Sequence, residues 1–238
     1  HMNEVIANIW IPAGADLRLF SPELALVATL ATLLIVPLIT GRNNQISAGI
    51  ALLGSLVSLL LAGMLLYGPV TSAALGGMSP DPAAPMLVVD KLSVFFKIFL
   101  MTFLVLVTWL WLMGQSSTAP GARHDPAGEP AGAEFFVLLI TSALGMSLMV
   151  STTNLLVMVI AIETASLPSY AIVASDKRSR LGAEASLKYV LFGAATAAIM
   201  VYGVSLLYGL FGTLDIPTIA AGIAAGGAST AVLLALLA

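Results

Sequence analysis

Six apolar runs of about 20 residues follow one another along this chain, and they limit its fold more than any other feature. Wound as an α-helix, a run of this length matches the roughly 30 Å hydrocarbon core of a bilayer. The runs show no alternation of apolar and polar residues, which argues against membrane strands. The chain is 59% hydrophobic and 9% charged, whereas about 25% of the residues in soluble domains are charged. We therefore predict an all-α polytopic membrane protein.

Complete transmembrane spans are expected over six segments: residues 22–40, 46–67, 91–113, 134–150, 154–174 and 186–210. The segments 76–85 and 114–133 are rich in Pro, Gly or polar residues and are expected to be loops. A seventh apolar run reaches Ala238 without a closing loop, so we expect the chain to be part of a longer protein. Trp109 and Trp111 lie near one end of the third span, where we expect them to be interfacial anchors.

Basic residues in the loops predict the orientation, because cytoplasmic loops carry an excess of Lys and Arg. The loops after the odd-numbered spans hold five of them: Arg42, Arg123, Lys177, Arg178 and Arg180. The opposite side holds Arg18 and Lys91. This asymmetry places the odd-span loops in the cytoplasm and the N-terminus outside.

Composition excludes several kinds of chemistry. The chain has no cysteine, which rules out disulfides, thiol catalysis and iron–sulfur or cysteine–zinc sites in it. Neither His1 nor His124 lies in an apolar segment, so haem held by two histidines in the membrane is also excluded. The net charge of −3 is small and scattered and gives no indication of nucleic-acid binding.

Glu163 lies near the middle of the fifth span, where an ionisable group is most costly. Insertion scales put that cost at about 2.5 to 3.5 kcal/mol, and such residues usually face a bundle interior or a water-filled path. Two interpretations are open: a carboxylate that loads and unloads a proton, or a structural acid paired permanently with a lysine. We favour proton handling.

Pro168 follows Glu163 by five residues within the same span. A proline lacks the N–H that would bond the carbonyl four residues earlier, which belongs to Thr164, and its ring clashes with that carbonyl. The loosened carbonyl could bind water beside the acid. A simple packing kink explains the proline equally well.

Two lysines also fall within predicted spans. Lys188 lies one turn inside the sixth span and could either take part in proton transfer or extend its ammonium to the lipid headgroups. Lys97 lies six residues into the third span, and for it we expect extension to the headgroups, with only a weak case for a role in proton translocation. Glu184 precedes the predicted sixth span and is expected to be an N-terminal helix acid favoured by the helix dipole.

Two stretches carry a specific resemblance. They are "GMSLMVSTTNLLVMVIAIETASLPSYAIVA" (145–174) and "RLGAEASLKYVLFGAATAAIMVYGVSLLYGLFGTLDI" (180–216). Both closely resemble subunit N of type-I NADH:quinone oxidoreductase (complex I), in the antiporter-like family that includes Mrp-type cation/proton antiporters. The close resemblance covers 134–216. The first three spans fit the family loosely, although "VDKLSVFFK" is similar in kind.

The resemblance implies a fourteen-helix fold with both termini outside and two inverted five-helix repeats. Residues 1–133 would then form helices 1 to 3 and a polar loop, and residues 134–238 an incomplete first proton-translocation repeat. Glu163 matches the family's fifth-helix glutamate, which pairs with a lysine on a broken seventh helix, expected here beyond Ala238. Lys188 matches a family lysine at the start of the sixth helix.

The resemblance further implies proton translocation driven by quinone reduction elsewhere in the complex. It implies no cofactor in this chain, with NADH, FMN, iron–sulfur clusters and quinone bound by other subunits. The expected partners are other membrane subunits of complex I, the lipid bilayer and protons, and the expected location is the bacterial inner membrane. A stand-alone Mrp-like antiporter subunit and a purely structural membrane subunit are the alternatives.

Overall fold

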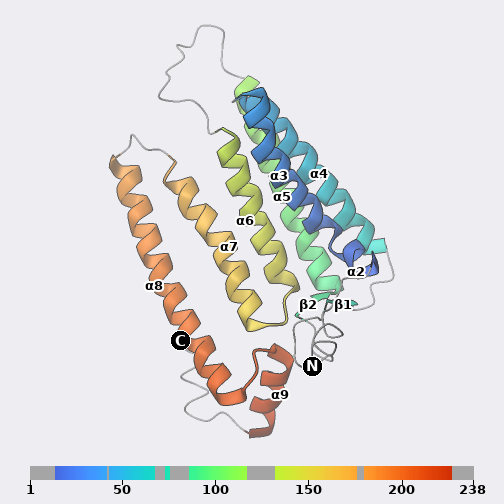
Figure 1. The fold of residues 1–238 in the computed structure, drawn as a ribbon, viewed down its shortest axis with the longest axis vertical. Coiled ribbons are helices and arrows are strands. Elements are labelled where there is room, and N and C mark those ends of the chain that lie inside the picture. The colour runs from blue at the N-terminus through green and yellow to red at the C-terminus, as the bar shows by residue number, and fades with distance from the viewer. Residues whose placement is uncertain are drawn as a thin grey trace, which may run out of the picture.

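The structure, a computed structural model, describes residues 14–41, 43–67, 73–75, 86–116, 132–175 and 180–226. Within these ranges six helices are long and apolar enough to cross a membrane. They are α3 (Ser21–Thr40), α4 (Asn44–Tyr67), α5 (Lys91–Ser116), α6 (Ala133–Ser151), α7 (Leu155–Val173) and α8 (Arg180–Phe211). The predicted multi-span helical fold is confirmed (Figure 1).

Shorter elements flank these helices. Helix α2 (Gly14–Leu19) precedes α3, and α9 (Ile216–Gly226) follows α8. Strands β1 (Ala73–Leu75) and β2 (Leu87–Val89) form a small antiparallel pair, which the sequence analysis did not predict.

The predicted bounds need one clear correction. The sixth span begins at Arg180 rather than near residue 186, because residues 180–185, which include Arg180 and Glu184, continue the helix outward by more than a turn. Of the predicted seventh run, only α9 falls within the described residues, and 227–238 lie outside them. The predicted loop 76–85 and most of 114–133 also lie outside the described residues, as do His1, His124, Arg42, Arg123, Lys177 and Arg178.

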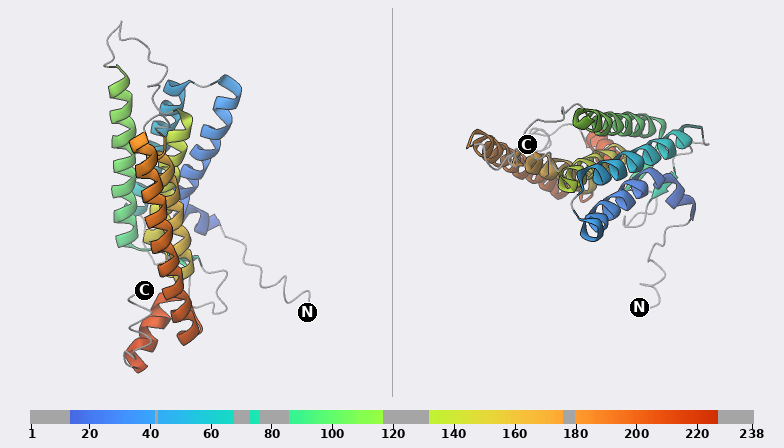
Figure 2. Two further views of the ribbon diagram at one scale, coloured as in Figure 1. Left: turned by 90° about the vertical axis from the view of Figure 1, so that its left-hand side faces the viewer. Right: turned by 90° about the horizontal axis from the view of Figure 1, so that it is seen from above.

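Helix α6 is the central element of the bundle. It contacts α3, α4 and α5 on one side and packs extensively against α7 on the other. Helix α8 packs on α7 and meets α9 at one end, so α7 separates α8 from the rest of the bundle (Figures 1 and 2). The helices that carry Glu163 and Lys188 thus form the outer part of the described bundle.

The apolar core lies where α3, α4, α5 and α6 meet. Phe136 and Ile140 of α6 are fully buried there against Leu26 of α3 and Met101 of α5. Trp111 joins this core, with its ring edge-to-face with Phe136 at a centroid distance of 4.9 Å. Trp111 therefore packs against the core while remaining partly exposed, and its role as an interfacial anchor stays a prediction. Trp109 is 51% exposed and stays available for that role.

One end of the bundle is tied together by backbone hydrogen bonds between three connections. Thr153 N donates to Met86 O beside β2, at 3.1 Å. Ile216 N donates to Thr153 O at 2.9 Å, and Leu155 N donates to Leu214 O at the same distance. These bonds link the α6–α7 turn to the segment before α5 and to the α8–α9 turn. They therefore hold the helices that flank these three connections at fixed positions along the bundle axis.

Candidate functional site

Glu163 occupies the middle of α7, a helix whose ends are well defined. The Asn154 side chain caps the start by accepting a hydrogen bond from Leu156 N at 3.0 Å, which satisfies one of the free N–H groups at a helix N-terminus. Glu163 itself is half-buried. Within the described ranges no cation lies at ion-pair distance from its carboxylate. The structure thus places an acid at mid-span with its carboxylate unpaired among these residues.

The segment of α7 around Glu163 lies very close to α6. A Cβ added to Gly145 would lie 2.5 Å from Ala165 N and 2.8 Å from Ala161 O, so only glycine permits this approach. From the same face of α6, Ser142 Oγ donates a hydrogen bond to Ala165 O at 2.9 Å. The backbone on either side of Glu163 is therefore held directly by α6.

Pro168 is buried inside α7, and the helix continues through it to Val173. Its missing N–H leaves the Thr164 carbonyl without its usual helical donor. The neighbouring Ala165 carbonyl accepts bonds from two hydroxyls, Ser142 Oγ and Ser169 Oγ, the second at 3.0 Å. Pro168 thus removes one backbone hydrogen bond of α7. The carbonyl of Ala165, which follows Thr164, is stabilised by one serine from α6 and one from α7.

Lys188 lies on the surface of α8. Its side chain is 64% exposed, and Nζ lies 2.5 Å from Oε1 of Glu184, one turn earlier on the same helix. Glu184 is therefore inside α8 and paired, which corrects the prediction of an N-terminal acid before the span. Lys188 and Glu163 form no ion pair in the described part of the chain.

Helix α8 meets α7 near Lys188 through aromatic residues. The rings of Tyr170 and Tyr189 lie edge-to-face, with centroids 4.7 Å apart. The Tyr170 hydroxyl comes so close to Gly193 that a Cβ there would lie 2.1 Å from it. Lys188 precedes one of these contact residues, so its backbone position depends on how α8 packs on α7.

Lys97 does not extend to the headgroups, and that prediction is wrong. Its side chain is 0% exposed, and Nζ lies 2.8 Å from Oε1 of Glu23, whose side chain is 6% exposed. Helix α5 presents Lys97 to the interior rather than to lipid because α3 supplies a carboxylate at the same depth. An ion pair so fully removed from solvent requires partners to offset its desolvation.

Glu23 is the functional candidate that the sequence analysis missed. It stands in the first turn of α3, inside the predicted first span. A signal was available in the sequence, since the first and third spans enter the membrane from the same side. An acid three residues into one and a lysine seven residues into the other should therefore lie at similar depths.

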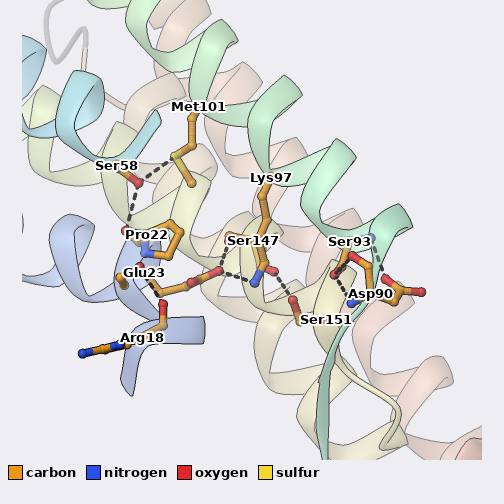
Figure 3. Close-up of polar contacts among 11 residues, drawn as sticks. Arg18, Pro22, Glu23, Ser58, Asp90, Ser93, Lys97, Met101, Ser147 and Ser151 are labelled. Atoms are coloured by element: carbon orange, nitrogen blue, oxygen red, sulfur yellow. Dashed lines mark hydrogen bonds and ion pairs between the residues drawn. The ribbon is translucent and has the colours of Figure 1, made fainter. Parts of the chain in front are cut away.

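Serines from two other helices complete the surroundings of this pair (Figure 3). Ser147 Oγ of α6 donates to Glu23 Oε1 at 2.5 Å, and Ser151 lies one turn further along α6. Ser58 Oγ of α4 donates to the carbonyl of Pro22, next to Glu23, at 2.9 Å. Four helices thus meet around one buried charge pair.

The fold and the mid-span acid define a class: a multi-span helical membrane protein with an ionisable residue in the middle of one span. Residues 152–238 match the family model described as "NADH:quinone oxidoreductase/Mrp antiporter, TM". NADH-quinone oxidoreductase subunit N 2 of Acidobacterium capsulatum is 36% identical over 86% of this chain and 40% of its own length. Subunit N of Azoarcus sp. is 34% identical over 98% of this chain and 42% of its own length.

Solved structures agree with these relatives. A chain of respiratory complex I from Thermus thermophilus matches with a TM-score of 0.65 and 27% identity, over 90% of this chain and 41% of that one. The Mrp complex from Dietzia sp. matches in fold, with a TM-score of 0.60 and 21% identity, over 92% of this chain and 40% of that one. The C-terminal part of the chain is thus similar to the NADH:quinone oxidoreductase/Mrp antiporter family, and most of the chain is similar to part of subunit N. It spans about 40% of the length of these curated relatives.

Proposed function

We propose that this chain is part of a proton-translocating membrane subunit of NADH:quinone oxidoreductase, the counterpart of subunit N. The observation that carries the proposal is Glu163, a half-buried carboxylate at the middle of a membrane-spanning helix, five residues before a buried proline. An acid at this depth is costly to insert and is usually kept for transport. The matches to subunit N over most of the chain support this reading over a stand-alone antiporter.

In the proposed mechanism, Glu163 exchanges charge partners rather than electrons. Quinone reduction in other subunits changes the charge along the membrane arm and separates Glu163 from a lysine on the seventh helix. The lysine's affinity for a proton then changes, so it takes up a proton from one side and releases it to the other. Close contact with α6 at Gly145 and Ser142 keeps the Glu163 segment in a fixed position during this cycle.

Lys188 and Lys97 have unequal roles in this mechanism. Lys188 is exposed on α8 and compensated by Glu184, so we propose that it assists proton entry near one end of the sixth helix. Lys97 is compensated by Glu23 and contributes nothing to the Glu163 step.

The proposal extends to cofactors, partners and location. We propose that this chain holds no redox cofactor and that NADH, FMN, iron–sulfur clusters and quinone bind to other subunits; the lack of cysteine supports this for iron–sulfur clusters. The partners would be other membrane subunits of complex I, lipid and protons. The protein would lie in the bacterial inner membrane with its N-terminus outside, as the basic residues of the loops indicate.

The test is Glu163→Gln in the complete subunit, assembled with its complex in native membranes. We expect proton pumping per electron pair and coupled quinone reductase activity to fall, with assembly on native gels unchanged. Glu134→Gln is the matched control, because Glu134 is an exposed acid in the first turn of α6. A pumping stoichiometry that stays at the wild-type value in Glu163→Gln would overturn the proposal.

A further inference from the structure

The buried pair of Glu23 and Lys97 lies apart from Glu163, and the proposed function makes no use of it. The two residues come from α3 and α5, and Ser147 joins them from α6. Glu23 Oε1 accepts a hydrogen bond from the Ser147 hydroxyl and lies 2.8 Å from the lysine ammonium, with which it forms an ion pair (Figure 3). Both contacts of the Glu23 carboxylate therefore involve the same oxygen.

Among the described residues, the second carboxylate oxygen and the ammonium have no hydrogen-bond partner. Glu23 Oε2 is fully buried and accepts no hydrogen bond from the described residues. The ammonium has three N–H donors, and Glu23 Oε1 is its one carboxylate contact in this part of the chain. Buried polar groups are nearly always satisfied by protein or by ordered water, and a buried water needs two to four polar partners.

Ser151 supplies a further partner for such a water. Its hydroxyl donates to the Ser147 carbonyl over 3.4 Å, a long and weak bond that leaves it free to turn. Glu23 Oε2, the remaining N–H groups of Lys97 and Ser151 Oγ thus meet the requirement for at least one internal water.

Two effects act on the charges of the pair in opposite directions. The Phe20 ring lies 5.3 Å from Lys97 Nζ and stabilises the ammonium through its π face. Complete burial opposes both charges. Moving one proton from Lys97 Nζ to Glu23 converts the ion pair to an amine and a carboxylic acid. The step leaves the net charge unchanged and needs no other reactant.

The site lies close to one end of the bundle, the end that carries β2 and the α6–α7 turn. Glu23 is the third residue of α3, Lys97 the seventh of α5, and Ser147 the fifth from the end of α6. At 1.5 Å per residue, these positions are about 3 to 9 Å from their helix ends. A short water path would therefore connect the pair with that face.

Four other charged residues of the described ranges lie near this end: Arg18, Asp90, Lys91 and Asp215. Lys91 is exposed at the start of α5, and Asp215 accepts a hydrogen bond from Thr218 N at 3.0 Å at the start of α9. Arg18 of α2 points away from the pair in Figure 3. Asp90 accepts from Ser93 N at 2.7 Å and so caps the start of α5. None of the four makes an ion pair with Glu23 or Lys97.

We propose that Glu23, Lys97, Ser147 and Ser151 bind internal water and form a second proton-exchange site, separate from Glu163. The site exchanges protons with the face of the membrane nearest β2 and the α6–α7 turn. The site binds water and transfers protons.

The first test is infrared difference spectroscopy of the assembled wild-type complex between low and high pH, in H₂O and D₂O. We expect the carbonyl band of a protonated carboxylic acid, which shifts in D₂O and disappears in Glu23→Gln. Thr108→Val is the matched control, because Thr108 is equally buried on α5 and bonds only within its own helix.

The band should persist in Glu163→Gln, which separates this inference from the proposed function. A wild-type spectrum with no Glu23-dependent band would overturn the proposal. The second test needs no variant: a density map of the wild-type complex, fine enough to resolve waters, should show one between Glu23 Oε2 and Lys97 Nζ. Direct protein contacts at both atoms, with no water between them, would also overturn it.

Discussion

At the scale of single residues, two Lys–Glu pairs of similar length have different physical meanings. Lys97 and Glu23 are buried, and their Nζ and Oε1 atoms are 2.8 Å apart. Lys188 and Glu184 are exposed, and the same two atoms are 2.5 Å apart. Water and salt screen the exposed pair, whose contribution is small. The buried pair has lost its hydration, so each charge depends on the other.

Lys97→Met should destabilise the protein more than the double variant Glu23→Gln/Lys97→Met. The single change leaves a buried carboxylate uncompensated, which costs about 3 to 5 kcal/mol, whereas the double change removes both charges. The measurement is a double-mutant cycle of thermal unfolding on the assembled complex. Equal losses in the single and double variants would mean that the two charges do not interact.

Lys188→Ala should change stability by less than about 0.5 kcal/mol, because exposed i,i+4 pairs contribute no more than this. Its effect on proton pumping should be smaller than that of Glu163→Gln. Both quantities can be measured on the same membrane preparations, with pumping followed by a pH-sensitive dye. A pumping loss equal to or larger than that of Glu163→Gln would reverse the proposed ranking of these two residues.

At the scale of elements, the α6–α7 contact sets the position of Glu163. Helix α6 uses its glycine and serine face for α7 and another face for the pair of Glu23 and Lys97. One helix therefore contacts both ionisable sites. A shift of α6 would disturb both.

Gly145→Ala should destabilise the α6–α7 contact by about 1 to 3 kcal/mol, the usual cost of overpacking. The added methyl group would meet the α7 backbone, which cannot rotate away as a side chain could. Gly63→Ala on α4 is the control, because its Cβ would meet no atom within 4 Å. That control should be neutral or slightly stabilising, since alanine favours helix over glycine. The measurement is the thermal unfolding of both variants, and equal stability of Gly145→Ala and Gly63→Ala would contradict the prediction.

Pro168→Ala should stabilise α7 locally and lower proton pumping. Alanine restores the N–H that bonds the Thr164 carbonyl, which removes a helix defect worth about 3 kcal/mol and the loosened carbonyl beside Glu163. Pumping per electron pair and the unfolding temperature should move in opposite directions. A rise in stability with unchanged pumping would identify Pro168 as a packing kink only.

At the scale of the whole molecule, the bundle has one end tied by backbone hydrogen bonds and a periphery of apolar side chains. Helix α8 exposes large residues such as Phe192, Leu181 and Tyr202 along its length. In a membrane protein such a surface faces lipid or other protein. Figure 2 shows α8 at the edge of the bundle, where it can contact lipid or other membrane subunits, the two kinds of neighbour proposed above.

The orientation can be tested by single-cysteine labelling, because residues 1–238 contain no cysteine. Asn43→Cys and Ser175→Cys lie in the loops after the first and fifth spans, and Thr213→Cys lies after the sixth. With a maleimide that cannot cross membranes, we expect Thr213→Cys to react from outside intact cells. Asn43→Cys and Ser175→Cys should react only after the membrane is opened. The reverse pattern would invert the proposed topology.

The sequence by itself determined the helices of the bundle and the depth of Glu163. Both follow from local properties, since the length of an apolar run fixes whether it spans a bilayer and the position of an acid within that run fixes its depth. The six predicted spans match α3 to α8, apart from the longer start of α8.

Only the tertiary structure decided what each polar or aromatic side chain faces. The sequence places Lys97 and Trp111 in the third span, but it does not say that Lys97 meets Glu23 from α3 or that Trp111 meets Phe136 from α6. These contacts depend on which helices are neighbours and which faces they turn toward each other. The rotation and depth of each helix come from the packing of the whole bundle, through close contacts such as Gly145 against α7 and the hydrogen bonds that tie one end together.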